Sequence, residues 1–272
     1  MRLTVLGSGS RGNALLVEAD GAALLVDAGF TFKDLLKRCD AAGCDPSLVR
    51  AVVLTHEHGD HARGAPRAAA AWRVPVVASR GTLHALEGRL PRTPASIPLH
   101  ASRARSIGPF AITAYPTAHD AAEPVMLVIE DADGRRLGVA YDVGTPTTAL
   151  RHALRGLDAL VVETNHDEVM LRASGYPPSV RARIAGHGGH LSNRQAGLLV
   201  AEAAHAELGT VVLAHLSDRC NRPEKALREV EAALRGSAFS GRIVVAGQDT
   251  PTAAIDVGAP SLQLALPLGR RR

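Results

Sequence analysis

Residues 55–61 read THEHGDH and carry more structural information than any other segment of the chain. Directly after an apolar segment that predicts a buried strand, this motif places four potential metal ligands: His56, His58, Asp60 and His61. In an extended or turning segment, His56 and His58 point the same way, whereas Asp60 and His61 turn into the next helix. Imidazole and carboxylate ligands without cysteine suit zinc, manganese or iron, and they argue against a closed structural zinc site. We therefore interpret the motif as a metal centre rather than as an exposed polar loop.

The segments around this motif predict a mixture of strands and helices. Short apolar segments bounded by glycine turns or polar residues predict strands at 3–6, 14–18, 23–27, 50–54, 74–78, 111–115, 124–130, 135–141, 158–163, 210–214 and 242–246, the last of which ends the series. Helical spacing of apolar residues predicts helices at 31–42, 62–72, 82–90, 193–208 and 223–234. Because strands cluster first and helices intervene later, we expect an α/β (α+β) fold in which two sheets pack face to face between helices, a four-layer αββα sandwich.

Composition and chain organisation narrow the class of protein further. At 272 residues with 46% hydrophobic residues, the chain can bury a sizeable core. No linker divides it, so we expect one domain over residues 1–255, followed by a flexible basic C-terminal tail at 256–272. The net charge of +4 is carried almost entirely by arginine, and it informs solubility and partners without locating a site.

The same features predict a cytoplasmic protein that does not enter a membrane. No apolar run approaches the roughly 20 residues that cross a bilayer, and the N-terminus lacks the pattern of a secretion signal. The three cysteines, Cys39, Cys44 and Cys220, form no CxxC pair, so we expect free thiols in a reducing compartment.

Three further strand ends can complete the ligand set for two ions. His119 and Asp142 follow the predicted strands at 111–115 and 135–141, and His215 follows the one at 210–214. A carboxylate can bridge two cations, which makes Asp142 the natural shared ligand. We propose one ion on His56, His58 and His119, the other on Asp60, His61 and His215, and Asp142 between them. His166 is the alternative to His215 as the histidine that completes the second metal site.

The motifs that contain these residues resemble those of the metallo-β-lactamase superfamily and, within it, of the YycJ/WalJ family of exonucleases. The resemblance covers residues 6–221, most of the chain. Its pieces are LGSGSRGNA at 6–14, VDAG at 26–29, LTHEHGDH at 54–61, AHDAAEP at 118–124, YDVG at 141–144, ETNHD at 163–167, GHLSN at 189–193 and AHLSDRCN at 214–221. HEHGDH indicates only the superfamily, whereas AHDAAEP, ETNHD and GHLSN together indicate the narrower family.

The resemblance implies an αββα hydrolase with two divalent metal ions, zinc or manganese with iron as a further candidate. It also implies 5′ to 3′ exonuclease activity on double-stranded DNA, so that DNA with a 5′ end is the expected partner. Two departures are visible: Val143 stands where threonine is usual after the bridging aspartate, and Arg11 replaces a small residue in the glycine loop. Neither removes a ligand, although Arg11 could alter the grip on a substrate.

A phosphate site is expected beside the metals, at the start of the helix predicted from residue 193. Ser192 and Gln195 form a capping-box pattern, and the free N–H groups of a helix start favour an anion. His190 would then stabilise charge at the scissile phosphate or protonate the leaving oxygen, a role that similar superfamily phosphodiesterases give to a histidine at this place. With Asp60 it forms the catalytic pair that we predict. The alternative is a helix cap with an exposed histidine.

Other polar residues are candidates for binding the substrate. The glycine-rich turn at 7–13 can cradle a phosphate, although tight turns between strands use the same residues. The ETNHD segment lies at a strand end near the metals and is expected to orient the ligands, and Asp27 is expected to support the histidine loop. The predicted substrate-binding residues are Ser8, Ser10, Asn13, Asn165, His166, Ser192 and Asn193. Arg172, Arg181 and Arg183 either follow a nucleic-acid backbone or belong to a solvated helix face.

Three other functions compete with a nuclease. A thioester or lactone hydrolase of the glyoxalase kind usually carries its third histidine in a Gly-His-Thr setting, but here the segment is Ala118-His119-Asp120. A tRNA 3′-processing endonuclease on the same fold stays open, as does a regulatory protein that senses metal without catalysis. We predict a dinuclear-metal phosphodiesterase because the polar segments suit a phosphate better than an acyl group.

Overall fold

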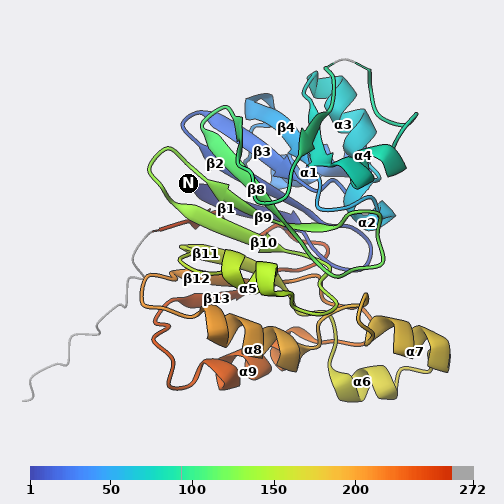
Figure 1. Cartoon of the computed structure of the whole chain (residues 1–272), viewed down its shortest axis with the longest axis vertical. Helices are drawn as coiled ribbons and strands as arrows, with labels where there is room; N and C mark the ends of the chain where they lie inside the picture. Colours follow the sequence, from blue (N-terminus) through green and yellow to red (C-terminus); the bar gives the residue numbers. More distant parts are fainter. Residues whose placement is uncertain (93, 259–272) are drawn as a thin grey trace, which may run out of the picture.

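Strands dominate the centre of the computed structural model (Figure 1), which describes residues 1–92 and 94–258. One sheet contains β1 (Arg2–Gly7), β2 (Ala14–Ala19), β3 (Ala22–Val26), β4 (Val49–Val53), β5 (Val76–Ser79), β6 (Ile97–Leu99) and β14 (Ile255–Asp256). The other contains β7 (Arg105–Ile107), β8 (Phe110–Pro116), β9 (Val125–Glu130), β10 (Arg136–Ala140), β11 (Ala159–Glu163), β12 (Thr210–Ala214) and β13 (Arg242–Val245). The two sheets face each other across a shared apolar core that includes Leu15, Val53 and Leu127.

Both sheets change from antiparallel to parallel pairing along their strand order. Within the described residues the orders are β14-β1-β2-β3-β4-β5-β6 and β13-β12-β11-β10-β9-β8-β7. Pairing is parallel from β3 to β6 and from β10 to β13, and antiparallel elsewhere. Strands such as β12, with the sequence TVVLA, are buried along their whole length, which explains their continuous apolar pattern. Because the carboxyl ends of parallel strands share an edge, the loops after them can build one site.

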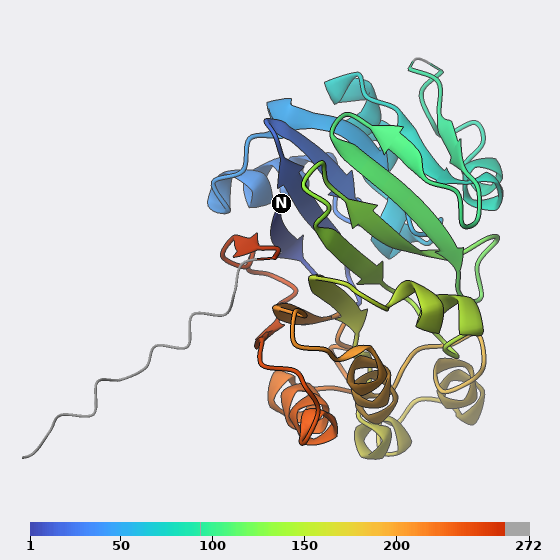
Figure 2. The same cartoon turned by 60° about the vertical axis from the view of Figure 1, so that its left-hand side comes forward.

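Helices cover the outer face of each sheet, as Figure 2 shows. The helices that follow strands of the first sheet are α1 (Phe32–Ala41), the short 3₁₀ helix η1 (Pro46–Leu48), α2 (Gly59–Ala62), α3 (Ala65–Trp72) and α4 (Arg80–Ala85). The helices associated with the second sheet are α5 (Thr148–Ala153), α6 (Glu168–Arg172), α7 (Pro178–Ile184), α8 (Asn193–Ala203) and α9 (Pro223–Leu234). Two further apolar clusters fill the spaces between helices and sheets. The predicted αββα sandwich is therefore confirmed.

Several element predictions were wrong in detail. The helix expected at 62–72 is divided into α2 and α3 at Gly64, where a Cβ atom would lie 2.2 Å from the carbonyl oxygen of Phe30. The helix expected at 193–208 ends at Ala203. The strand at 242–246 is not the last, because β14 pairs with β1. From residue 259 onward, the predicted tail lies outside the described residues.

Two expectations about composition can also be compared with the structure. All three cysteines are free thiols, as predicted. Among the described residues, no helix is long and apolar enough to span a bilayer.

Candidate metal centre

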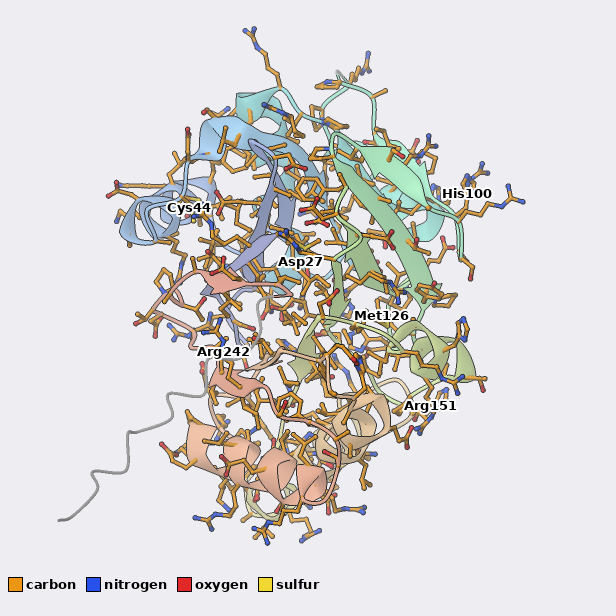
Figure 3. All side chains as sticks on the ribbon, turned by 90° about the vertical axis from the view of Figure 1, so that its left-hand side faces the viewer. Asp27, Cys44, His100, Met126, Arg151 and Arg242 are labelled. Atoms are coloured by element: carbon orange, nitrogen blue, oxygen red, sulfur yellow. The ribbon has the colours of Figure 1, made fainter. Side chains whose placement is uncertain are left out.

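The loops after five strands converge at the carboxyl edge of the sheets. The THEHGDH motif follows β4, and the strands β3, β10, β11 and β12 lead into Asp27, Asp142, Glu163 and His215. The backbones of Asp27, Asp142 and His215 are left-handed, with φ of 56°, 48° and 52°. Asp and His tolerate this region better than most residues, and such strain concentrates at functional sites. Figure 3 shows Asp27 in the interior of the molecule.

All seven predicted metal ligands come together. His56, His58, His119 and Asp142 each offer one atom within 4.8 Å of the others, and Asp60, His61 and His215 form a second such group. These are the two ligand sets predicted from the sequence. A third group joins Asp142 and His215 to Glu163 and His190. His166 belongs to none of these groups among the described residues, so the geometry favours His215 over its rival.

Hydrogen bonds orient the imidazoles so that one nitrogen of each faces the cluster. Nδ1 of His61 donates to Asp27 Oδ2 at 2.7 Å, and Nδ1 of His119 donates to the carbonyl of Gly189 at 3.0 Å. With Nδ1 occupied, the Nε2 lone pair of each ring is directed inward. Metal-binding histidines usually have such an outer partner, which fixes the tautomer. Asp27 therefore supports the histidine loop.

His56 provides a direct test of whether the residues fit metal ions. Its Nδ1 lies 3.0 Å from the hydroxyl of Thr55, which itself donates to Asp27. Its Nε2 is buried without a hydrogen-bond partner, 3.4 Å from Asp142 Oδ2. Buried polar atoms are rarely left unpaired. A cation between His56 and Asp142 would satisfy this nitrogen, so the donor set fits a divalent metal.

The electrostatics of the cluster also favour cations. Burial raises the pKa of Asp142, but the charges of His215 and His61 lower it by more than burial raises it. The pKa therefore lies well below its usual range. For Asp60, burial is likewise outweighed by its hydrogen bond with His215 and by the charge of His61, and the pKa is lowered. Both carboxylates are therefore negatively charged at neutral pH, as ligands of a divalent cation must be.

Glu163 links the cluster of predicted metal ligands to His190. Its Oε1 accepts from Nδ1 of His190 at 2.6 Å and from Nδ1 of His215 at 2.9 Å. Its Oε2 accepts from the backbone N–H groups of Val143 and Leu191. Burial raises the pKa of Glu163, but the charge of His190 brings it down to about 2. Sequence reasoning placed Glu163 near the metals but did not assign it this shared role.

The glycine-rich turn supports two of the predicted metal ligands, and most of its side chains are not accessible to a substrate. The Ser8 hydroxyl donates to Asn13 Oδ1 at 2.8 Å and accepts from the N–H of His215 at 2.8 Å. Asn13 Nδ2 lies 3.1 Å from His61 Nε2. Because Ser8 and Asn13 are buried in these contacts, their expected role in binding a substrate is not supported. Only Ser10 of this predicted group lines the cleft.

The expected phosphate site at the start of α8 is occupied by protein groups. The predicted capping box of Ser192 and Gln195 is confirmed. However, the N–H of Asn193 donates to the carbonyl of His166, and the Ser192 hydroxyl donates to Glu168 Oε1 at 3.1 Å. A carboxylate at this position repels an anion. The structure therefore argues against Ser192, Asn193 and the buried His166 as substrate-binding residues.

The two departures from the family pattern have simple structural explanations. Arg11 is exposed and pairs with Asp218 at 3.2 Å and with Asp249 at 2.7 Å, so it joins the glycine turn to two other loops. Val143 contributes its backbone N–H to Glu163, and its side chain packs in the apolar cluster under the helices. Neither change removes a group from the metal cluster.

Gly29 allows the motif loop to pack closely, which gives a testable prediction. A Cβ atom at Gly29 would lie 1.7 Å from the carbonyl oxygen of Asp60, so Gly29→Ala must displace the ligand loop. We expect a loss of about 1–3 kcal/mol in unfolding free energy, as in other overpacked sites, together with weaker metal binding. Gly59→Ala is the matched control, because nothing lies within 4 Å of its Cβ position. Equal stability and metal content of the two variants would contradict this explanation.

A cleft of about 200 Å³ opens onto the metal cluster. It is lined by Ser10, His58, Asp60, His119, Asp142, Asn165, Tyr176, Arg183, Ile184, His190, His215 and Ser217. Asn165 was a predicted substrate-binding residue, and it also donates to the carbonyl of His215 at 3.2 Å. Tyr176, Ile184 and Ser217 were not predicted. Tyr176 is an isolated aromatic residue in a Gly-Tyr-Pro-Pro segment, and only the scarcity of aromatic residues in this chain could have drawn attention to it.

Comparison with known proteins identifies the family. Residues 23–216 match the Beta-lactamase superfamily domain. The chain is 33% identical over 242 residues to the exodeoxyribonuclease YycJ of Bacillus anthracis, covering 88% of this chain and 91% of that protein. It is 28% identical over 234 residues to the exodeoxyribonuclease WalJ of Streptococcus pneumoniae, covering 83% and 85%. The crystal structure of the metallo-beta-lactamase fold protein YhfI from Bacillus subtilis superimposes with a TM-score of 0.69 at 20% identity, covering 92% of this chain and 98% of that one. The chain therefore belongs to the beta-lactamase superfamily and, within it, to the YycJ/WalJ family.

Proposed function

We propose that this protein is a dinuclear-metal phosphodiesterase that acts in the cytoplasm as a 5′ to 3′ exonuclease on double-stranded DNA. The observation that carries the proposal is the contact of His190 with Glu163 directly beside two clusters of metal ligands. A histidine held by a buried carboxylate at the metals suits the protonation of a leaving alkoxide, which phosphodiester cleavage requires. The exodeoxyribonuclease relatives support DNA as the substrate.

The residues proposed to hold the metals are His56, His58, His119, Asp60, His61 and His215, with Asp142 shared between the two groups. When bound, two zinc or manganese ions would act as Lewis acids on the phosphoryl oxygens and on the attacking water.

The protein's own groups position the reactants and move the protons. Asp60 is partly exposed at the cleft and keeps its negative charge, so it can orient the attacking water through a hydrogen bond. Burial lowers the pKa of His190, but the charge of Glu163 raises it more, so that the pKa lies above its usual value. This shift favours the protonated imidazolium. With Nδ1 bonded to Glu163, the Nε2–H of His190 is the group that can donate to the departing oxygen.

The test is incubation of the purified protein with end-labelled duplex DNA. Substrates carry 5′-phosphate or 5′-hydroxyl ends, and manganese, zinc and magnesium are compared. We expect mononucleotides to be released from 5′ ends and EDTA to stop the reaction. Elemental analysis should find two transition-metal ions per chain after loading.

Parallel substrates separate the competing functions. A tRNA precursor with a 3′ trailer tests the endonuclease, and a glutathione thioester tests the glyoxalase-type hydrolase. If the protein cleaved the thioester rapidly and left every nucleic acid intact, the nuclease proposal would be wrong. If it bound metals but turned over no substrate, the regulatory alternative would gain support.

A further inference from the structure

Tyr176 lines the cleft, and the reaction described above does not use it. It is half-buried and borders the same cavity as Asp60 and His190. The other two tyrosines, Tyr115 and Tyr141, pack against apolar clusters. Among the described residues that line this cleft, Tyr176 is therefore the one Phe, Tyr or Trp side chain.

The ring of Tyr176 is held by its neighbours. The guanidinium carbon of Arg219 lies 4.6 Å from the ring centroid, close enough for a cation–π contact. The N–H of Tyr176 donates to the hydroxyl of Ser174 at 3.3 Å, which fixes the backbone on the other side. The contact also brings a positive charge beside the ring, where it favours an electron-rich, anionic ligand.

The segment that carries Tyr176 is tied to the metal loops. In Figure 1, α6 and α7 lie on the same side of the molecule as α2, which belongs to the ligand motif. Nε of Arg183, in α7, donates to Asp120 Oδ2 at 2.8 Å, and Asp120 follows the ligand His119. The backbone N–H of Asp120 donates to the carbonyl of Gly188 at 3.0 Å. These two contacts tie the C-terminal end of α7 to the loop that carries His119. Tyr176, just before the N-terminal end of α7, is held by Arg219.

The dimensions of the cleft limit what can reach this ring. A volume of about 200 Å³ is below the roughly 300–1,000 Å³ of typical ligand pockets. We expect such a small cleft to admit a single nucleotide in preference to a base pair. Enzymes that act on a nucleotide within a duplex commonly take it out of the stack, and an aromatic side chain then replaces the lost stacking.

We propose that Tyr176, held by Arg219, stacks on the base of the terminal nucleotide and so holds that nucleotide unpaired at the metals. This inference rests on the proposed nuclease function. Every base presents an aromatic face, so the platform accepts all four bases. Loss of one such stacking contact corresponds to about a 5- to 150-fold weaker interaction.

The test compares two 5′-labelled duplexes that differ only in the terminal nucleotide, which is either normal or abasic. For the wild-type protein, kcat/KM should be about 5- to 150-fold higher for the normal terminus. In Tyr176→Ala this ratio should approach one, mainly through KM. Tyr176→Phe and Tyr176→Trp should retain it, and Arg219→Gln should reduce it in part.

The possible outcomes distinguish this inference from the function on which it rests. If Tyr176→Ala lowered kcat/KM equally for both termini, Tyr176 would be merely structural and the inference would be wrong, with the nuclease function intact. The same conclusion would follow if the wild-type protein degraded both duplexes equally well. A wild-type protein loaded with metal that degraded neither duplex would refute the nuclease function, and this inference with it.

Discussion

Replacing Asp142 with asparagine is expected to reduce hydrolysis by about 1,000-fold or more while the fold is retained. The carboxylate lies within 3.4 Å of the ring nitrogens of His56, His61 and His119, and 2.9 Å from that of His215. Asparagine keeps the shape but removes the negative charge that both ligand groups share. Turnover of labelled DNA and the metal content of the purified variant are the two measurements, and both should fall.

Asp133→Asn is the matched control for the loss of an aspartate charge. Asp133 is exposed in the turn between β9 and β10 and pairs with Arg135 on the surface. Exposed pairs of this kind contribute about 0–1 kcal/mol to stability, so this variant should retain metal and activity. If Asp142→Asn kept wild-type turnover with a full complement of metal, the proposed metal centre would be wrong. A far-UV circular dichroism spectrum like that of the wild type would show that the fold is retained.

The sequence allowed the layers of the fold to be predicted because the long elements have strong patterns. The segments TVVLA at 210–214 and ALVVE at 159–163 each contain at least four consecutive apolar residues, and both are parallel strands that are buried along their whole length. In contrast, β14 has two residues and β6 and β7 have three each, too few for a periodic pattern. Their existence depends on pairing with distant strands, such as β14 with β1, and local sequence carries no signal for that.

The ligands were easier to predict than the residues that bind the substrate. Each ligand is a histidine or aspartate at the end of a strongly patterned strand, so topology alone brings them together. The capping box at Ser192 is also a local pattern, and it formed as predicted. Whether its N–H groups are free for a phosphate depends on His166 and Glu168, which contact it only in the folded chain. Local rules predict the cap but not its surroundings.

The contacts of Glu163 also could not be predicted from local sequence. The ETNHD segment indicated polar residues near the metals, but nothing in it indicates which histidines its glutamate meets. The answer comes from β11 lying between β10 and β12, so that Glu163 reaches both His215 and His190. The order of the strands therefore explains why one carboxylate, that of Glu163, accepts hydrogen bonds from both His215 and His190.

His190→Ala is expected to reduce cleavage of DNA by about 100- to 10,000-fold, the usual contribution of a general acid. The loss should be much smaller for bis-p-nitrophenyl phosphate, because p-nitrophenolate leaves without being protonated. Glu163→Gln should show the same difference between substrates at a smaller size, since it keeps the shape that holds Nδ1 of His190 but loses the negative charge. Because Glu163 also contacts His215, metal content must be measured for each variant.

The comparison of the two substrates separates proton donation from every structural explanation. A distorted site or a lost metal ion would slow both reactions together, since both pass through attack of water on phosphorus. The loss of a proton donor, in contrast, slows cleavage more for a poor leaving group, such as the alkoxide of DNA, than for p-nitrophenolate. An equal loss on DNA and on the p-nitrophenyl ester would contradict proton donation by His190. If metal content and the circular dichroism spectrum were also unchanged, stabilisation of charge on the phosphate would be the role left for this residue. In that case, the bond between Glu163 and His190 would serve to hold the imidazolium in place rather than to prepare it as a donor.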